Sequence, residues 1–79
     1  MNDIKHLVQT ANSVYELVTK ENGGYTLRKV FALSPPSVVV DSEKLEGTHV
    51  VLREGKLELW NGNRILIKTS RVFLITRIP

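Results

Sequence analysis

Short β-favouring segments, each closed by turn residues, follow one another from Tyr25 to the end of the chain, and they constrain its fold more than any other feature. Apolar runs of this length bounded by Gly, Asn and Pro are typical of strands joined by tight turns. They predict strands at residues 25–33, 38–41, 48–53, 56–60, 64–68 and 71–78. The separators at 54–55, 61–63 and 69–70 are short enough for hairpins.

The first part of the chain has a different period. Its apolar residues recur at steps of three and four: Ile4, Leu7, Val8, Ala11, Val14, Tyr15 and Val18. This spacing predicts an amphipathic helix over about residues 3–21, ended by Gly23 and Gly24. We therefore expect a single α+β domain over residues 1–79, mainly β, in which the helix precedes an antiparallel meander curled into a small barrel or a strongly bent sheet.

The hairpin registers follow from requiring one apolar face, because a one-residue slip turns every side chain to the other side. We place Arg53 opposite Lys56, a three-residue loop at 61–63, and Lys68 opposite Arg71. The predicted inner face is then wholly aliphatic: Val50, Leu52, Leu57, Leu59, Ile65, Ile67, Val72 and Leu74.

The net charge of +3 is concentrated in the C-terminal part of the chain. Residues 1–47 hold five Lys and Arg against six Asp and Glu, whereas residues 48–79 hold six against two. The registers above place four of these six cations in one row of the outer face: Arg53, Lys56, Lys68 and Arg71. Neighbouring like charges destabilise a sheet unless they extend into water or an anion neutralises them.

Phosphate is the anion that most often binds such a row, so the row is a candidate nucleic-acid site. Trp60 and Phe73 lie on the same predicted face and are placed to stack on bases. Arg64, opposite Trp60, joins this set as a phosphate contact or as a cation–π partner of the indole. We predict a non-catalytic nucleic-acid-binding module, with RNA slightly favoured.

Two alternatives stay open. Cations beside hairpin turns are common because turns are wet, so the row is also explained as a solvated surface. The apolar outer residues Leu66, Phe73 and Ile75 form a candidate interface, which favours a protein–protein interaction or assembly module. A chain this small buries only about 60% of its unfolded surface, so we also expect a homo-oligomer.

Other classes are disfavoured. Cysteine is absent, and His6 and His49 lie far apart without a carboxylate at ligand spacing, so we expect no metal and no cofactor. The sequence has neither a nucleophile elbow nor a glycine-rich phosphate loop, so we expect no enzyme. It also has no long apolar run and no export signal, which predicts a cytoplasmic protein that does not enter membranes.

Residues 38–40 form a short β-branched run, residues 44–47 end in a glycine at which a strand can bend, and residues 65–72 suggest two strands joined by a tight turn. In these stretches residues 38–79 resemble the Sm-like family, which includes the bacterial Sm-like RNA chaperones. The first stretch is similar to the first strand of that fold, the second to the start of its second strand, and the third to its last two strands. The resemblance implies an SH3/Sm-like barrel that assembles into a ring. It also implies RNA contacts around Thr69 and Ser70, with Lys68 and Arg71 beside them.

Overall fold

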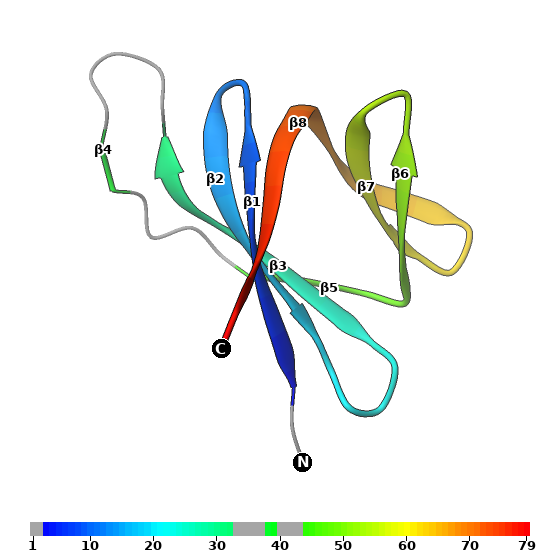
Figure 1. Cartoon of the computed structure of the whole chain (residues 1–79). Coiled ribbons are helices and arrows are strands. Elements are labelled where there is room, and N and C mark those ends of the chain that lie inside the picture. The colour runs from blue at the N-terminus through cyan, green and yellow to red at the C-terminus, as the bar shows by residue number, and fades with distance from the viewer. Residues whose placement is uncertain (1–2, 33–37, 40–43) are drawn as a thin grey trace.

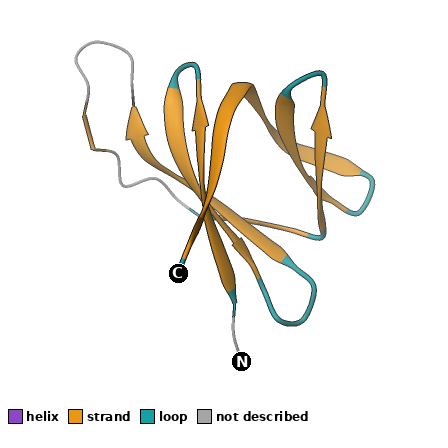
Figure 2. Cartoon of the chain, in the orientation of Figure 1, coloured by secondary structure: helices purple, strands orange, loops and turns teal. Residues whose placement is uncertain are grey.

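The computed structural model of the chain describes residues 3–32, 38–39 and 44–79. These residues form eight strands and contain no helix (Figures 1 and 2). In chain order the strands are β1 (Ile4–Thr10), β2 (Ser13–Thr19), β3 (Tyr25–Ala32), β4 (Val38–Val39), β5 (Leu45–Gly47), β6 (His49–Arg53), β7 (Lys56–Asn61) and β8 (Arg64–Ile78). The strands predicted from Tyr25 onward are present, with the last two merged into β8; residues 33, 40 and 41 lie outside the described residues.

The helix predicted over residues 3–21 is wrong. β1 and β2 form an antiparallel hairpin instead, with Gln9 opposite Val14. Three- and four-residue steps between apolar residues also arise when two strands with alternating apolar residues reverse in a tight turn. In addition, β1 and β2 are rich in β-branched residues, which favour extended backbone. The Thr10 hydroxyl closes that turn, because it accepts a hydrogen bond from the Ser13 N–H at 3.1 Å and donates one to the Ser13 carbonyl at 3.0 Å.

The strands form one curled antiparallel sheet. Its order is β4-β3-β2-β1-β8-β7-β6, and β5 also pairs with β3. β1 and β2 thus lie in the middle of the sheet rather than covering it. β5 pairs with β3 near one end of this order, whereas β6 is the last strand at the other end. Only Thr48 separates β5 from β6 in the chain. This connection curls the sheet into a half-barrel (Figure 1), so the barrel-like part of the fold prediction is confirmed while its α+β class is not.

The hairpin turn predicted at Thr69 and Ser70 is absent, because β8 continues through these residues as one strand. Its first part pairs with β7, and from Val72 onward it pairs with β1. At the change of partner, the Thr69 hydroxyl accepts a hydrogen bond from the Leu57 backbone N–H at 3.1 Å, and the Ser70 hydroxyl donates one to the Thr10 hydroxyl at 3.1 Å. The Thr69 side chain thus satisfies a backbone N–H that the regular ladder leaves unpaired, and the strand bends there without reversing.

The β6–β7 register is confirmed, whereas the β7–β8 register is not. Arg53 lies opposite Lys56 as predicted. Asn61 pairs with Arg64, so the β7–β8 loop has two residues rather than three, and Leu59 faces Ile67. The prediction required one wholly aliphatic face and assumed that no bulge interrupts the ladder, but the register shifts twice along β7 and β8.

The core lies between the two halves of the curled sheet. Its buried cluster draws residues from β1, β2, β3 and β7: Val8, Tyr15, Leu17, Leu27, Leu57 and Leu59. Of the predicted inner face, Leu57 and Leu59 are buried, and three residues pack against the cluster, namely Val50, Ile67 and Val72. The other three are exposed: Leu52, Ile65 and Leu74. The predicted apolar face was therefore partly wrong, because β1, β2 and β3 supply much of the core in place of a helix.

The corner between β5 and β6 generates a prediction about stability. A Cβ atom added to Gly47 would lie 2.6 Å from both the Trp60 carbonyl oxygen and Leu59 Cδ1, which is too close for a real contact. We expect Gly47→Ala to lower the free energy of unfolding by about 1–3 kcal/mol in urea denaturation, because it overpacks this corner. At Gly24 the nearest atom would be 3.4 Å away, so Gly24→Ala is the control and is expected to stay within about 0.5 kcal/mol of the wild type. Equal stability of the two variants would contradict the tight corner.

Candidate nucleic-acid interface

The outer surface of β6, β7 and β8 gathers most of the residues that the sequence singled out, and we call it the basic face. The observed registers arrange it in three rows that run across these strands. The first row holds His49, Trp60 and Ile65, the second Val51, Glu58 and Lys68, and the third Arg53, Lys56 and Arg71.

The third row brings together three of the four cations predicted to lie side by side. Arg53, Lys56 and Arg71 are on three adjacent strands, and all three are exposed. Lys68 lies one row away, opposite Glu58, because the bulge around residues 69–70 shifts β8 relative to β7. The predicted cationic row is thus present with three members rather than four.

A buried carboxylate lies inside the basic face. The side chain of Glu58 is 4% exposed, and it lies 3.9 Å from Lys68 Nζ and 4.0 Å from Arg53 Nε. Its Oε1 also accepts a hydrogen bond from Trp60 Nε1 at 3.0 Å. The protein therefore supplies part of the neutralising charge itself. Four cations and one carboxylate still leave the face positively charged.

An aromatic pair occupies the opposite end of the basic face from the cationic row. The rings of His49 and Trp60 are nearly parallel, at 11°, with their centroids 5.9 Å apart. The Thr48 hydroxyl lies 3.1 Å from His49 Nδ1 and accepts a hydrogen bond from the Gly62 N–H at 2.8 Å. His49 is exposed and Trp60 is half-buried. The predicted register of this hairpin, with Arg53 opposite Lys56, also puts His49 opposite Trp60, but the sequence was considered to offer His49 only as a metal ligand.

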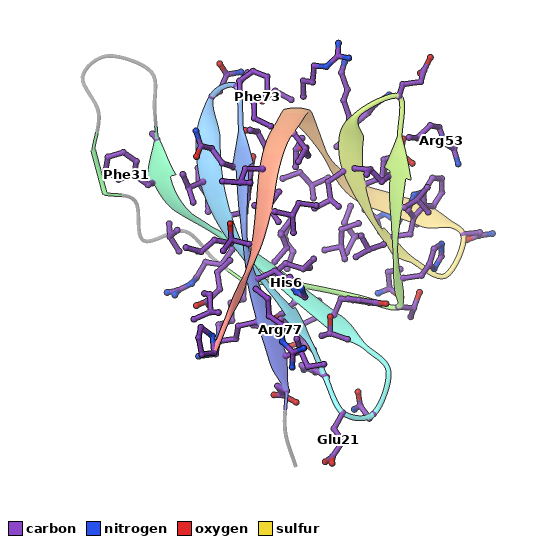
Figure 3. All side chains as sticks on the ribbon, in the orientation of Figure 1. His6, Glu21, Phe31, Arg53, Phe73 and Arg77 are labelled. Atoms are coloured by element: carbon purple, nitrogen blue, oxygen red, sulfur yellow. The ribbon has the colours of Figure 1, made fainter. Side chains whose placement is uncertain are left out.

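The remaining predicted residues lie apart from the basic face. Phe73 follows the corner of β8, at a bulge in the pairing with β1, and Figure 3 shows it near the β1–β2 turn, well separated from Arg53. Leu66 packs against the core. Ile75 lies opposite Val8 on β1. The prediction that these three apolar residues share one face with the cations was wrong. Leu66 lies at a register shift between β7 and β8, and Phe73 and Ile75 follow a strand that continues past residues 69–70 instead of turning.

Arg64 does not lie opposite Trp60 as predicted. It pairs with Asn61 beside the β7–β8 loop, because that loop is one residue shorter than expected. The indole stacks on His49. Arg64 remains exposed and close in sequence to the first row of the basic face.

Three further features of the described residues concern metal ligands, the pKa of a buried phenol and membrane spans. No three His, Asp or Glu side chains there are placed to hold a metal ion. Burial raises the pKa of the Tyr15 phenol, which moves this group further from proton exchange at neutral pH. The described residues form strands only, and they include no helix that is long and apolar enough to cross a membrane.

No protein-family model, curated protein or solved structure matches this chain. The case for a function therefore depends on the residues and their geometry.

The position of Glu58 generates a second prediction about stability. Glu58→Gln removes the only carboxylate of the basic face and leaves its cations to repel one another. We expect a loss of about 1 kcal/mol in the free energy of unfolding at low salt, and a smaller loss at high salt because salt screens the repulsion.

The matched control is Glu46→Gln. Glu46 pairs with Lys20 at 3.5 Å but its side chain is 74% exposed, so we expect a change within about 0.5 kcal/mol. If Glu58→Gln is as stable as the control at low salt, the carboxylate does not offset the cations.

Proposed function

We propose that this chain is a non-catalytic nucleic-acid-binding module that uses its basic face, with RNA slightly favoured. The observation that carries the proposal is the exposed row of Arg53, Lys56 and Arg71 across three adjacent strands. RNA is favoured because residues 38–40 and 44–47 resemble the first two strands of the Sm-like RNA chaperones; the third similar stretch, 65–72, lacks the tight turn of that fold. Neighbouring strands lie about 4.8 Å apart, so the three cations span about 10 Å, a length suited to successive phosphates of one strand.

The charge balance supports a polyanion over a merely solvated surface. Glu58 contacts Lys68 and Arg53, whereas neither Lys56 nor Arg71 forms an ion pair with another described residue. The side chain of Arg71 passes close to Gly55 in the β6–β7 turn, where a Cβ atom would lie 3.5 Å from Arg71 Nε. The guanidinium group therefore lies next to the turn that joins the strands of Arg53 and Lys56. Three exposed cations on neighbouring strands are suited to an anion.

The salt dependence of binding tests this proposal. With a fluorescent single-stranded RNA of about ten nucleotides, we expect binding at about 50 mM salt and a loss of about 20-fold in affinity at about 200 mM, from a slope near −2 for about three phosphate contacts. Arg53→Ala, Lys56→Ala and Arg71→Ala combined should abolish most of this affinity.

The control combines Lys5→Ala, Lys44→Ala and Arg77→Ala, which removes three exposed cations outside the basic face. Both triple variants lower the net charge from +3 to 0. Equal loss in the two variants would indicate unspecific attraction to a positive protein. Equally poor binding by the wild type and the first variant at low salt would rule out the proposed function.

The alternative function is assembly with a second copy of the chain. It is favoured by three consecutive exposed apolar residues after the corner of β8: Phe73 at 65%, Leu74 at 56% and Ile75 at 42%. Large apolar side chains exposed to this extent are candidates for an interaction surface. Because successive residues of a strand point to opposite faces, Leu74 lies with Gln9 on one face and Ile75 with Val8 on the other. Leu66 no longer belongs to this surface, because it packs against the core.

Sedimentation velocity tests the assembly. We expect the wild type to associate with rising concentration and Phe73→Glu to stay monomeric, because a carboxylate cannot be buried unpaired at the interface. Leu52→Glu is the control, since Leu52 is similarly exposed at 58% but lies on β6. A wild type that remains monomeric at all concentrations would exclude the assembly.

A further inference from the structure

We infer that the basic face takes nucleic acid as a single strand, with one unpaired base stacked on the exposed side of His49. This inference rests on the proposed function and names its substrate class. It is carried by the aromatic pair of the first row and by the position of that pair at the edge of the sheet.

The two rings are held in place before any ligand arrives. Trp60 Nε1 donates to the buried carboxylate of Glu58 at 3.0 Å, which fixes the indole against the face. His49 lies parallel to it, and its Nδ1 is 3.1 Å from the Thr48 hydroxyl. That hydroxyl is itself fixed by the Gly62 N–H at 2.8 Å. A preorganised ring pair loses little conformational entropy when a third ring stacks on it.

The sheet leaves one side of the imidazole accessible. Trp60 covers the side of His49 that faces β7. β6 is the last strand on the path of the sheet, and none of the described strands pairs with its other edge. His49 is exposed, so a flat ring can continue the stack beyond β6.

The spacing of the site explains why the strand must be single. His49 and Arg53 are four residues apart on β6, which is about 13 Å at 3.3 Å per residue. At 3.4 Å per nucleotide of a stacked strand, about four nucleotides cover this length. A chain that follows β6 from His49 to Arg53 and then crosses to Lys56 and Arg71 therefore stacks a base at one end and meets the three cations at the other. A duplex presents its phosphates to the cationic row but keeps its base faces inside its own stack. It therefore contacts the cations without stacking a base on His49.

The experiment compares three RNA probes at low salt: a pyrimidine-only single strand of about ten nucleotides, the same strand in a duplex, and a strand of equal length with a stable abasic sugar at every position. Trp60 is the only tryptophan, so its fluorescence reports on the aromatic pair without a label. We expect the single strand to bind about tenfold more tightly than the other two probes and to be the only one that quenches Trp60.

Two substitutions separate stacking from charge. His49→Ala is expected to weaken binding of the single strand about tenfold while leaving the abasic strand unchanged, and His49→Phe is expected to keep the tight binding because it keeps a flat ring. His6→Ala is the matched control, because His6 lies on β1 outside the basic face.

The outcomes distinguish this inference from the function on which it rests. If the single strand, the duplex and the abasic strand bind equally well and His49→Ala changes nothing, the stacking site is wrong while phosphate binding by the basic face stands. If none of the three probes binds at low salt, the proposed function and this inference fail together.

Discussion

The change of partner along β8 determines where the other strands and the basic face can lie. One strand serves two neighbours because it bends at Thr69 and Ser70, and the bend is possible only if the backbone groups freed there find partners. The Thr69 hydroxyl accepts the Leu57 N–H, and the Ser70 hydroxyl reaches Thr10 in the β1–β2 turn. Two small polar side chains thus join both halves of the sheet. The Thr69 hydroxyl takes the place of a ladder bond to β7, and the Ser70 hydroxyl adds a side-chain hydrogen bond to the β1–β2 turn.

The same bend separates the cations from the apolar residues that the sequence analysis placed on one face of the sheet. The register shift leaves Arg71 beside Lys56 and moves Lys68 opposite Glu58. Phe73 comes after the corner, and so it joins the surface beside β1. A surface expected to combine cations with an apolar patch is therefore two surfaces, on different halves of the half-barrel. This separation allows the nucleic-acid and assembly proposals to be tested with different variants.

The sequence pattern was sufficient to predict the strand pairing where the turn residues and the alternation of apolar residues agreed. The β6–β7 hairpin around Gly55 is the example, because its register was predicted correctly. The pattern failed at β1 and β2, because apolar steps of three and four fit a helix face as well as two strands that reverse at Asn12. The outcome there is decided by pairing with the neighbouring β3 and with β8, which is distant in sequence. The alternation of apolar and polar residues does not reveal β-bulges either. The pairing of Lys68 with Glu58, which depends on a bulge in β8, was therefore not predicted. The place of His49 next to Trp60 was foreseen, but its stacking depends on side-chain geometry that alternation does not specify.

The central position of β1 has a consequence for how the chain reaches its fold. Lys5 lies opposite Ile78, so the first and last described strands are neighbours in the middle of the sheet. β1 can be paired on both sides only after nearly the whole chain has been synthesised, and closing so long a loop costs entropy before any contact repays it. Until then the β1–β2–β3 sheet presents an open edge that can pair with other chains. Folding of this small protein is therefore expected to be slow for its length, and its nascent form is most exposed to misassembly along β1.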